Sequence, residues 1–174
     1  LGTSTYSKAA PTQYMANYQM IAGKSAEFGD LEMFFKVVTL PSVPTGHTVV
    51  DAKIGLVMAN NYAPEYTYFG ISKLTSALTD AQFNQLLIPW SQRPAYGEPM
   101  DYLRQYGNNY NSTFYWDVTS AAKDWYENPS TNYGLAIASV KSDYSNAEVW
   151  TRYYRTTAVF TVNYRNTTGI ESYY

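Results

Sequence analysis

Residues 49–59 alternate between an apolar and a more polar side, and this alternation constrains the fold more than any other feature of the sequence. The even positions carry Val50, Ala52, Ile54, Leu56 and Met58. Because successive side chains of a strand point to opposite faces, this period of two predicts a strand with one buried face. A second alternation covers 157–165, where one face carries Ala158, Phe160, Val162 and Tyr164.

Five further segments favour strands, although their alternation is less regular: 31–40, 66–71, 113–118, 134–140 and 147–154. The joints between strands are rich in Pro, Gly, Asn, Asp and Ser, which are typical of turns. These joints are 41–46, Asn60-Asn61, 106–109, 128–130 and 142–146. Many short strands separated by turns predict an all-β fold, and specifically a jelly-roll-like β-sandwich.

Two short helices are predicted between the strands. Thr79 followed by Gln82 forms a capping box, and Leu78 and Phe83 occupy the flanking apolar positions, so a helix is expected over 80–87. A second helix begins after Thr119 and ends at Asn128-Pro129. Its apolar face carries Ala121, Ala122 and Trp125, and we interpret Trp125 and Trp116 as core residues. Both helices are expected to cover open ends of the sandwich.

The length of 174 residues predicts a single domain over 1–174. The chain begins with Leu1 rather than Met, and the polar and aromatic segment 166–174 follows the last regular strand. We interpret this segment as the exit of a domain that belongs to a larger surface protein. No apolar run approaches the ~20 residues of a membrane-spanning helix, so no membrane span is expected.

The composition excludes several kinds of site. Cysteine is absent and histidine occurs once, which excludes disulfides, cysteine nucleophiles and metal sites built from Cys or from several His. The net charge is -2 and only 15% of residues are charged, so no basic stripe is available for nucleic acid. Tyrosine is instead abundant, with 19 residues, and together with the many Thr it indicates an extracellular all-β domain.

Several segments, taken in order, are similar to one known family. The run FYWDVTSAAKDWY at 114–126, followed by STNYGL at 130–135, resembles the W-D-[IV]-T-x-A-[VA]-K-x-W and N-Y-G-[IL] signature of DNRLRE domains. The segments FFKV and LPSVPTG within 34–46, and AKIGL at 52–56, are similar to that family's early strand, Pro-Gly turn and next strand. WSQRP at 90–94 resembles its W-x-x-x-P segment.

The end of the chain extends this resemblance. YRNTTGIE at 164–171 resembles the junction at which such domains lead into the RHS/YD-repeat portion of large bacterial surface proteins. The resemblance implies an extracellular β-sandwich, similar to carbohydrate-binding modules, in a secreted or wall-associated protein. It supplies no catalytic motif. The chain departs from the family at 85–89, where QLLIP replaces a Thr-rich approach to Trp90, so the family's binding specificity is not carried over.

Aromatic side chains are the expected ligand-binding residues, because the C–H faces of sugar rings pack on flat, weakly polar rings. The segment 89–110 has no clear period and is expected to be a loop. Its candidates are Trp90, Tyr96, Tyr102 and Tyr106. Trp150 and Tyr153 are added because they lie on opposite faces of the strand at 147–154, so that at least one should face away from the core.

A calcium site is a weaker expectation, because jelly-roll modules often hold this ion with carboxylates and carbonyls. The candidate ligands are Glu98, Asp101 and Asp143. No Asp-x-Asp-x-Asp loop is present, and hydrogen bonds within turns are the alternative role for these residues.

Catalysis is not expected. The one histidine, His47, lies in a predicted turn, and nothing resembles a nucleophile elbow. Glycoside cleavage needs only two suitably spaced carboxylates, so it stays open as an alternative. The acids near predicted loops or helix ends are Glu98, Asp101, Asp117, Asp124 and Glu127.

Three functions follow. The first is a non-catalytic, secreted or cell-surface module that binds a polysaccharide or surface glycan, on a cell wall or a host surface, beside other domains of its parent protein. The second is a structural spacer or self-assembling filament subunit, because low charge and many Tyr equally suit protein contacts. The third is a carboxylate-based polysaccharide hydrolase or lyase.

Overall fold

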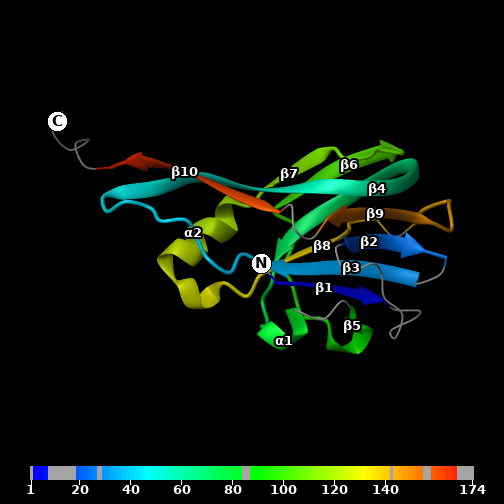
Figure 1. The fold of residues 1–174 in the computed structure, drawn as a ribbon, viewed down its shortest axis with the longest axis horizontal. Coiled ribbons are helices and arrows are strands. Elements are labelled where there is room, and N and C mark those ends of the chain that lie inside the picture. Colours follow the sequence, from blue (N-terminus) through cyan, green and yellow to red (C-terminus); the bar gives the residue numbers. More distant parts are fainter. Residues whose placement is uncertain are drawn as a thin grey trace.

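Figure 1 shows the fold in a computed structural model, which describes residues 2–7, 19–26, 29–83, 87–141, 143–154 and 158–167. The strands are β1 Gly2–Ser7, β2 Gln19–Ser25, β3 Gly29–Lys36, β4 His47–Lys73, β5 Leu87–Pro89, β6 Asp101–Gly107, β7 Thr113–Asp117, β8 Leu135–Ser139, β9 Val149–Tyr154 and β10 Val159–Asn166. The helices are α1 Asp80–Phe83, α2 Thr119–Glu127, and the 3₁₀ turns η1 Trp90–Gln92 and η2 Pro129–Thr131. The all-β class is therefore confirmed, with two short α-helices among the described residues.

The long strand β4 organises the sheet. Its 27 residues pair with β10 over 47–55, β7 over 53–57, β9 over 58–62, β6 over 63–71 and β8 over 69–73. The pairing register shifts between Met58 and Asn60 and again between Ala63 and Thr67. Such irregularities bend a strand and increase its twist. One strand can therefore take part in two distant portions of the same sheet.

The bend in β4 closes the sheet into a barrel. Antiparallel ladders join β4 to β9, β9 to β2, β2 to β3, β3 to β8, and β8 back to β4. β6, β7 and β10 extend the sheet along β4, and β1 and β5 extend it beside β3. The sheet thus differs from the predicted jelly-roll-like sandwich. Two stacked sheets would have separate edges, whereas here residues 58–62 and 69–73 of the same strand, β4, belong to one closed circuit.

The barrel interior holds the main core. Its large, fully buried side chains are Trp116, Trp125, Tyr153, Phe35, Phe69, Met20, Met33, Ile54 and Leu56. Ala121, Ala122 and Trp125 of α2 are buried, as their spacing predicted, and they pack into this core. The core roles predicted for Trp116 and Trp125 are therefore confirmed.

A second, smaller core lies on the outer side of β3 and β8. It consists of Phe34, Leu74, Leu78, Phe83, Ile88 and Ala136. The capping box of α1 is confirmed, since Gln82 N donates to Thr79 Oγ1 at 3.1 Å and Thr79 N donates to Gln82 Oε1 at 2.9 Å. The helix ends at Phe83 and β5 begins at Leu87, so it is shorter than predicted. It packs beside β1 and β3 and not over an open end of the sheet.

The strand predicted at 49–59 is present, but its buried face changes at one point. Ala52 is buried as expected, whereas Val50 is exposed and Val49 is buried instead. The cause is a bulge, because Asn163 and Tyr164 of β10 pair with Asp51 and Val49 and leave Val50 as an additional residue. An extra residue in one strand reverses the alternation beyond it.

The turn predicted at Asn60-Asn61 is wrong, because both residues lie inside β4. Asn61 is buried, and both ends of its side-chain amide form a hydrogen bond. Oδ1 accepts a hydrogen bond from Asn109 N at 2.6 Å, and Nδ2 donates to Gln105 Oε1 at 3.4 Å. These bonds offset the cost of burying a polar side chain within a strand.

Among the described residues, no helix has the length and apolar character needed to cross a membrane.

Candidate functional site

The structure separates the predicted aromatic residues into four places. Trp90 and Tyr96 lie beside Glu32 on the outer side of β3, whereas Tyr102 and Tyr106 lie on β6. Trp150 is half-buried on β9, where its ring stacks on Tyr62 with 6.3 Å between centroids. Tyr153 lies in the core. The candidates therefore do not form one binding surface.

The ligand-binding role predicted for Tyr153 is wrong, because this side chain is fully buried. Its hydroxyl accepts a hydrogen bond from Gln105 Nε2 at 2.7 Å, and its ring meets Trp116 edge-on at 5.6 Å. Burial raises the pKa of the Tyr153 hydroxyl. The prediction that Trp150 and Tyr153 face opposite ways is confirmed, since only Tyr153 is enclosed by the barrel.

The segment expected as one loop, 89–110, contains η1 and the strand β6. β6 alternates, because Leu103 and Gln105 turn inward while Tyr102, Arg104 and Tyr106 are exposed. The alternation of β6 is hard to recognise in the sequence because its buried face carries Gln105, and glutamine is mostly an exposed residue. Its burial is explained by its hydrogen bonds to Asn61 and Tyr153.

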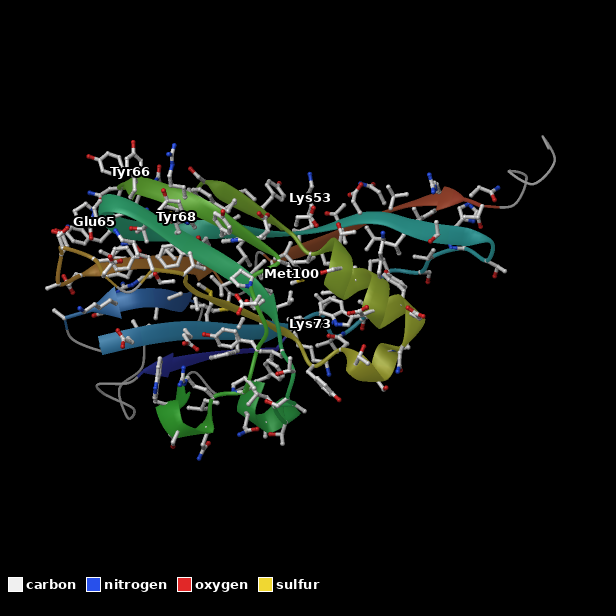
Figure 2. The ribbon with its side chains drawn as sticks, turned by 180° about the vertical axis from the view of Figure 1, so that it is seen from behind. Lys53, Glu65, Tyr66, Tyr68, Lys73 and Met100 are labelled. Carbon is white, nitrogen blue, oxygen red and sulfur yellow. The ribbon has the colours of Figure 1, made fainter. Side chains whose placement is uncertain are left out.

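The outward residues of β4 and β6 form what we call the tyrosine face: Tyr66 and Tyr68 of β4 with Tyr102, Arg104 and Tyr106 of β6. Cross-strand pairing sets their positions, because Tyr68 pairs with Arg104 and Gly70 pairs with Tyr102. Figure 2 shows Tyr66 and Tyr68 near one end of the molecule, with Glu65 beside them. Sequence reasoning missed Tyr66 and Tyr68, although their spacing of two was a usable signal.

The rings of the tyrosine face contact one another and stay open to solvent. Tyr66 and Tyr106 lie 4.9 Å apart between centroids, and Tyr68 and Tyr102 lie 6.2 Å apart. The guanidinium carbon of Arg104 is 4.6 Å from the Tyr66 centroid. Even so, Tyr66, Tyr102 and Tyr106 are 51%, 60% and 59% exposed. The face is thus a broad aromatic surface with hydroxyl groups and one cation.

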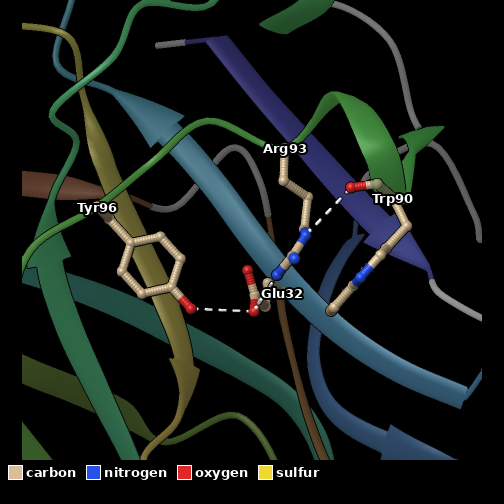
Figure 3. Close-up of polar contacts among 4 residues, drawn as sticks. All are labelled: Glu32, Trp90, Arg93 and Tyr96. Carbon is tan, nitrogen blue, oxygen red and sulfur yellow. Dashed lines mark hydrogen bonds and ion pairs between the residues drawn. The ribbon is translucent and has the colours of Figure 1, made fainter.

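A second arrangement surrounds Glu32, as Figure 3 shows. Glu32 Oε1 accepts hydrogen bonds from Arg93 Nη1 and from the Tyr96 hydroxyl, both at 2.9 Å. Arg93 Nε donates to the backbone oxygen of Trp90 at 3.1 Å, and its guanidinium carbon lies 3.7 Å from the centre of the indole. Tyr96 therefore has a structural role beside Glu32, and its ring packs on the smaller core.

Burial dominates the electrostatics of Glu32. Its side chain is 12% exposed, and within the described part of the chain Oε2 is buried without a hydrogen-bond partner. Burial raises the pKa of Glu32 above its ordinary 4.5, although Arg93 and Tyr96 oppose this shift. Burial and the nearby Glu32 charge together raise the pKa of Tyr96.

The raised pKa predicts a specific pH dependence of stability. The folded protein binds the Glu32 proton more tightly than the unfolded chain does, so protonated Glu32 stabilises the folded state. This stabilisation is complete below pH 4.5, and it is lost as the pH rises through the pKa of Glu32 in the folded protein. Glu32→Gln does not titrate. We therefore expect the unfolding free energy of the native protein, minus that of Glu32→Gln, to fall as the pH rises from 4 to 7 in urea unfolding. A difference that grows over this range would mean that the Arg93 ion pair outweighs burial.

A groove of about 350 Å³ opens beside this arrangement. It is lined by Gly23, Lys24, Asp30, Leu31, Glu32, Trp90, Ala138, Ser139, Lys141 and Tyr144. These residues come from β2, β3, β8, η1 and the segment after β8. Lys141 Nζ lies 5.0 Å from the centre of the Tyr144 ring. The groove therefore combines two aromatic rings with charges of both signs.

The structure does not gather the three predicted calcium ligands into one group. Glu98 and Asp143 are exposed, and Asp101 accepts backbone hydrogen bonds from Tyr102 N at 2.8 Å and Asp117 N at 2.7 Å. Asp101 begins β6 and links it to β7, so its role is structural but differs from the hydrogen bonds within a turn that were the alternative. The described part of the chain contains no group of three or more His, Cys, Asp or Glu residues that could hold a metal ion.

Among the remaining acids, Asp117 and Asp124 have structural partners, whereas Glu127 is exposed at the end of α2. Asp117 Oδ1 accepts a hydrogen bond from Thr119 N at 2.8 Å, and the hydrogen bonds from Thr119 lower the pKa of Asp117. Asp124 forms an ion pair with Lys73. His47 lies at the start of β4, where Nδ1 is 3.2 Å from Thr45 O. None of these contacts assembles a nucleophile with a base.

No family model matches this chain, and no curated protein matches it either. The resemblance to DNRLRE domains therefore stays a prediction. The function has to be argued from the geometry of the tyrosine face and of the groove.

Proposed function

We propose that this protein is a non-catalytic module that binds a polysaccharide or surface glycan on the tyrosine face. The observation that carries the proposal is the exposure of Tyr66, Tyr102 and Tyr106, each more than half open to solvent on adjacent strands. Clustered exposed aromatic rings are unusual on a monomeric surface, and such patches mark binding sites.

The chemistry of the face suits sugars. A pyranose ring has C–H groups that pack on an aromatic ring and hydroxyls at its rim that need polar partners. The tyrosine hydroxyls and the Arg104 guanidinium supply those partners at the edge of the rings. Contacts between neighbouring rings, such as Tyr66 with Tyr106 at 4.9 Å, restrict the side chains before a ligand arrives. This restriction lowers the entropic cost of binding.

The location follows from the same proposal. A module that holds wall or host polysaccharide acts outside the cell, in a secreted or cell-surface protein. The resemblance to DNRLRE domains favours this location, and it implies further domains in the same parent protein. Asp101, Asp117 and Asp124 are hydrogen-bond or ion-pair partners of other residues, so we do not propose a hydrolase or lyase.

Self-association is the second candidate, because the same face also suits contacts with another copy of the chain. Tyr and Arg are enriched among the residues that dominate protein interfaces. The tyrosine face supplies four Tyr and one Arg side by side. A structural spacer or filament subunit would use this face to meet its neighbours.

Affinity electrophoresis distinguishes these functions. The native protein is expected to be retarded in gels that contain at least one member of a panel of wall and plant polysaccharides. Sedimentation velocity of the same sample is expected to show a monomer. Retardation by no polysaccharide, together with oligomers that grow with concentration, would contradict the binding function and favour self-association. Release of reducing ends from any polysaccharide would support the hydrolase alternative instead.

A further inference from the structure

We propose that the groove beside Glu32 is a second binding site, which takes one neutral sugar residue, or two, at the end of a glycan chain. The proposal relies on the proposed function only for the class of ligand, because the groove and the tyrosine face use different residues. Its evidence is the size of the groove, the charges of both signs that line it, the setting of Trp90 and its place on the sheet.

The size of the groove limits its ligand. Ligand pockets typically occupy about 300 to 1,000 Å³, so about 350 Å³ lies near the lower end of that range. A groove of this size accommodates a small polar ring but not several residues of a polymer. It therefore suits the end of a chain, whereas the flat tyrosine face suits the side of one.

The groove is lined by charges of both signs. Lys24 and Lys141 contribute two ammonium groups, and Asp30 and Glu32 contribute two carboxylates, of which Glu32 is already paired with Arg93 at 2.9 Å. A hydroxyl both donates and accepts hydrogen bonds, so adjacent hydroxyls of a sugar can donate to a carboxylate and accept from an ammonium group. An anionic ligand would meet the two carboxylates, and a cationic ligand would meet the two lysines. A neutral polyol matches the lining best.

Trp90 lies at the wall of the groove and is held there by Arg93. The Arg93 guanidinium lies against the indole at 3.7 Å, and Glu32 in turn holds Arg93 through a 2.9 Å ion pair. Arg93 is therefore a positioning residue, because it acts on the ligand through Trp90. A fixed aromatic wall beside hydrogen-bonding groups is the combination that recognises a sugar ring.

The groove and the tyrosine face lie on the same side of the sheet, and the side chains of Pro99 and Val140 cover Gly70 between them. Ala138 of β8 lines the groove and pairs with Gly70 of β4, which pairs with Tyr102 of β6. Directly paired residues share one face of a sheet, and two strand spacings separate Ala138 from Tyr102 by about 10 Å. The two sites are therefore close together but separate, so each is tested with its own ligand.

Binding is tested by NMR on the full chain with uniform ¹⁵N labelling. The probes are methyl glycosides of neutral hexoses and hexose disaccharides, with glucuronate and glucosamine as charged comparisons. The indole N–H signal of Trp90, assigned with Trp90→Phe, is expected to shift with at least one neutral probe. Lys141→Gln and Asp30→Asn are each expected to weaken this binding about tenfold, as for loss of one hydrogen bond to a charged group. Arg104→Gln on the tyrosine face is the control and is expected to leave it unchanged.

The outcomes separate the two proposals. If no neutral probe shifts the Trp90 signal while polysaccharide still retards the protein, the groove proposal is wrong and the proposed function stands. If glucuronate or glucosamine binds more tightly than the neutral probes, the assignment to a neutral ligand is wrong. If Arg104→Gln weakens probe binding as much as Lys141→Gln does, the probe occupies the tyrosine face and the groove is not its site. If a neutral probe shifts the Trp90 signal but no polysaccharide retards the protein, binding at the groove is supported and binding at the tyrosine face is contradicted.

Discussion

Trp125→Ala is expected to lower the unfolding free energy by about 3 to 5 kcal/mol, the usual cost of removing a large buried aromatic side chain. Trp125 is fully buried and joins α2 to the barrel core, where its ring meets Phe160 of β10 at 6.1 Å. Its removal leaves a cavity and loosens the contact between α2 and β10. Urea unfolding of the variant, followed by circular dichroism, measures this cost.

Two comparisons separate the cost of removing a buried ring from the cost of removing a hydrogen bond. Tyr110→Ala removes an aromatic ring that is 63% exposed, and it is expected to change stability by less than about 0.5 kcal/mol. Among the described residues Trp125 Nε1 is buried without a partner, whereas Trp116 Nε1 donates to Phe69 O at 3.2 Å. Trp116→Phe should therefore cost about 1 kcal/mol more than Trp125→Phe, the net value of one hydrogen bond. Equal losses for Trp125→Ala and Tyr110→Ala would contradict the placement of Trp125 in the core.

The double variant Tyr102→Ala/Tyr106→Ala is expected to reduce polysaccharide affinity about tenfold or more. Each aromatic contact contributes about 0.5 to 1.5 kcal/mol beyond its buried area, and tenfold corresponds to about 1.4 kcal/mol. Both rings are largely exposed, so the fold should be retained. The loss of their contacts with Tyr66 and Tyr68 is expected to cost under about 2 kcal/mol of stability. Affinity electrophoresis over a range of polysaccharide concentrations measures the effect.

Tyr164→Ala is the matched control for this variant. Tyr164 is also an exposed tyrosine on a strand, but it lies on β10, where it pairs with Val49 and its ring meets His47 edge-on at 5.4 Å. This variant is expected to bind polysaccharide like the native protein. If both variants lose affinity equally, the tyrosine face is not the binding surface. If polysaccharide retards the double variant as much as the native protein, the glycan binds outside the tyrosine face.

Much of the secondary structure could be predicted because its signals are local. The alternation at 49–59, the capping box at Thr79 and the apolar face of α2 each depend on residues close together in the chain. The structure contains all three, although α1 is shorter than predicted and the bulge at Val50 reverses one end of the alternation. That bulge arises from β10, more than 100 residues away, so no local pattern could reveal it.

Three of the errors occurred where polar side chains are buried. Asn61 and Gln105 look like surface or turn residues in the sequence, yet they form a buried chain of hydrogen bonds that includes Tyr153. A polar residue is stable inside a protein when another part of the chain supplies its partners. Those partners come from different strands, so the turn at Asn61, the loop in place of β6 and the ligand-binding role of Tyr153 were all predicted wrongly.

The sequence by itself determined that this chain folds into strands with two short helices, because period and capping are properties of neighbouring residues. It also determined the aromatic surplus that a binding surface requires. Only the tertiary structure decided that the sheet closes through β4 and which tyrosines face solvent. It also brought Glu32, Trp90 and Lys141 to one groove. The physical reason is that exposure and proximity depend on which distant strands pair, and strand pairing is set by the packing of the whole chain.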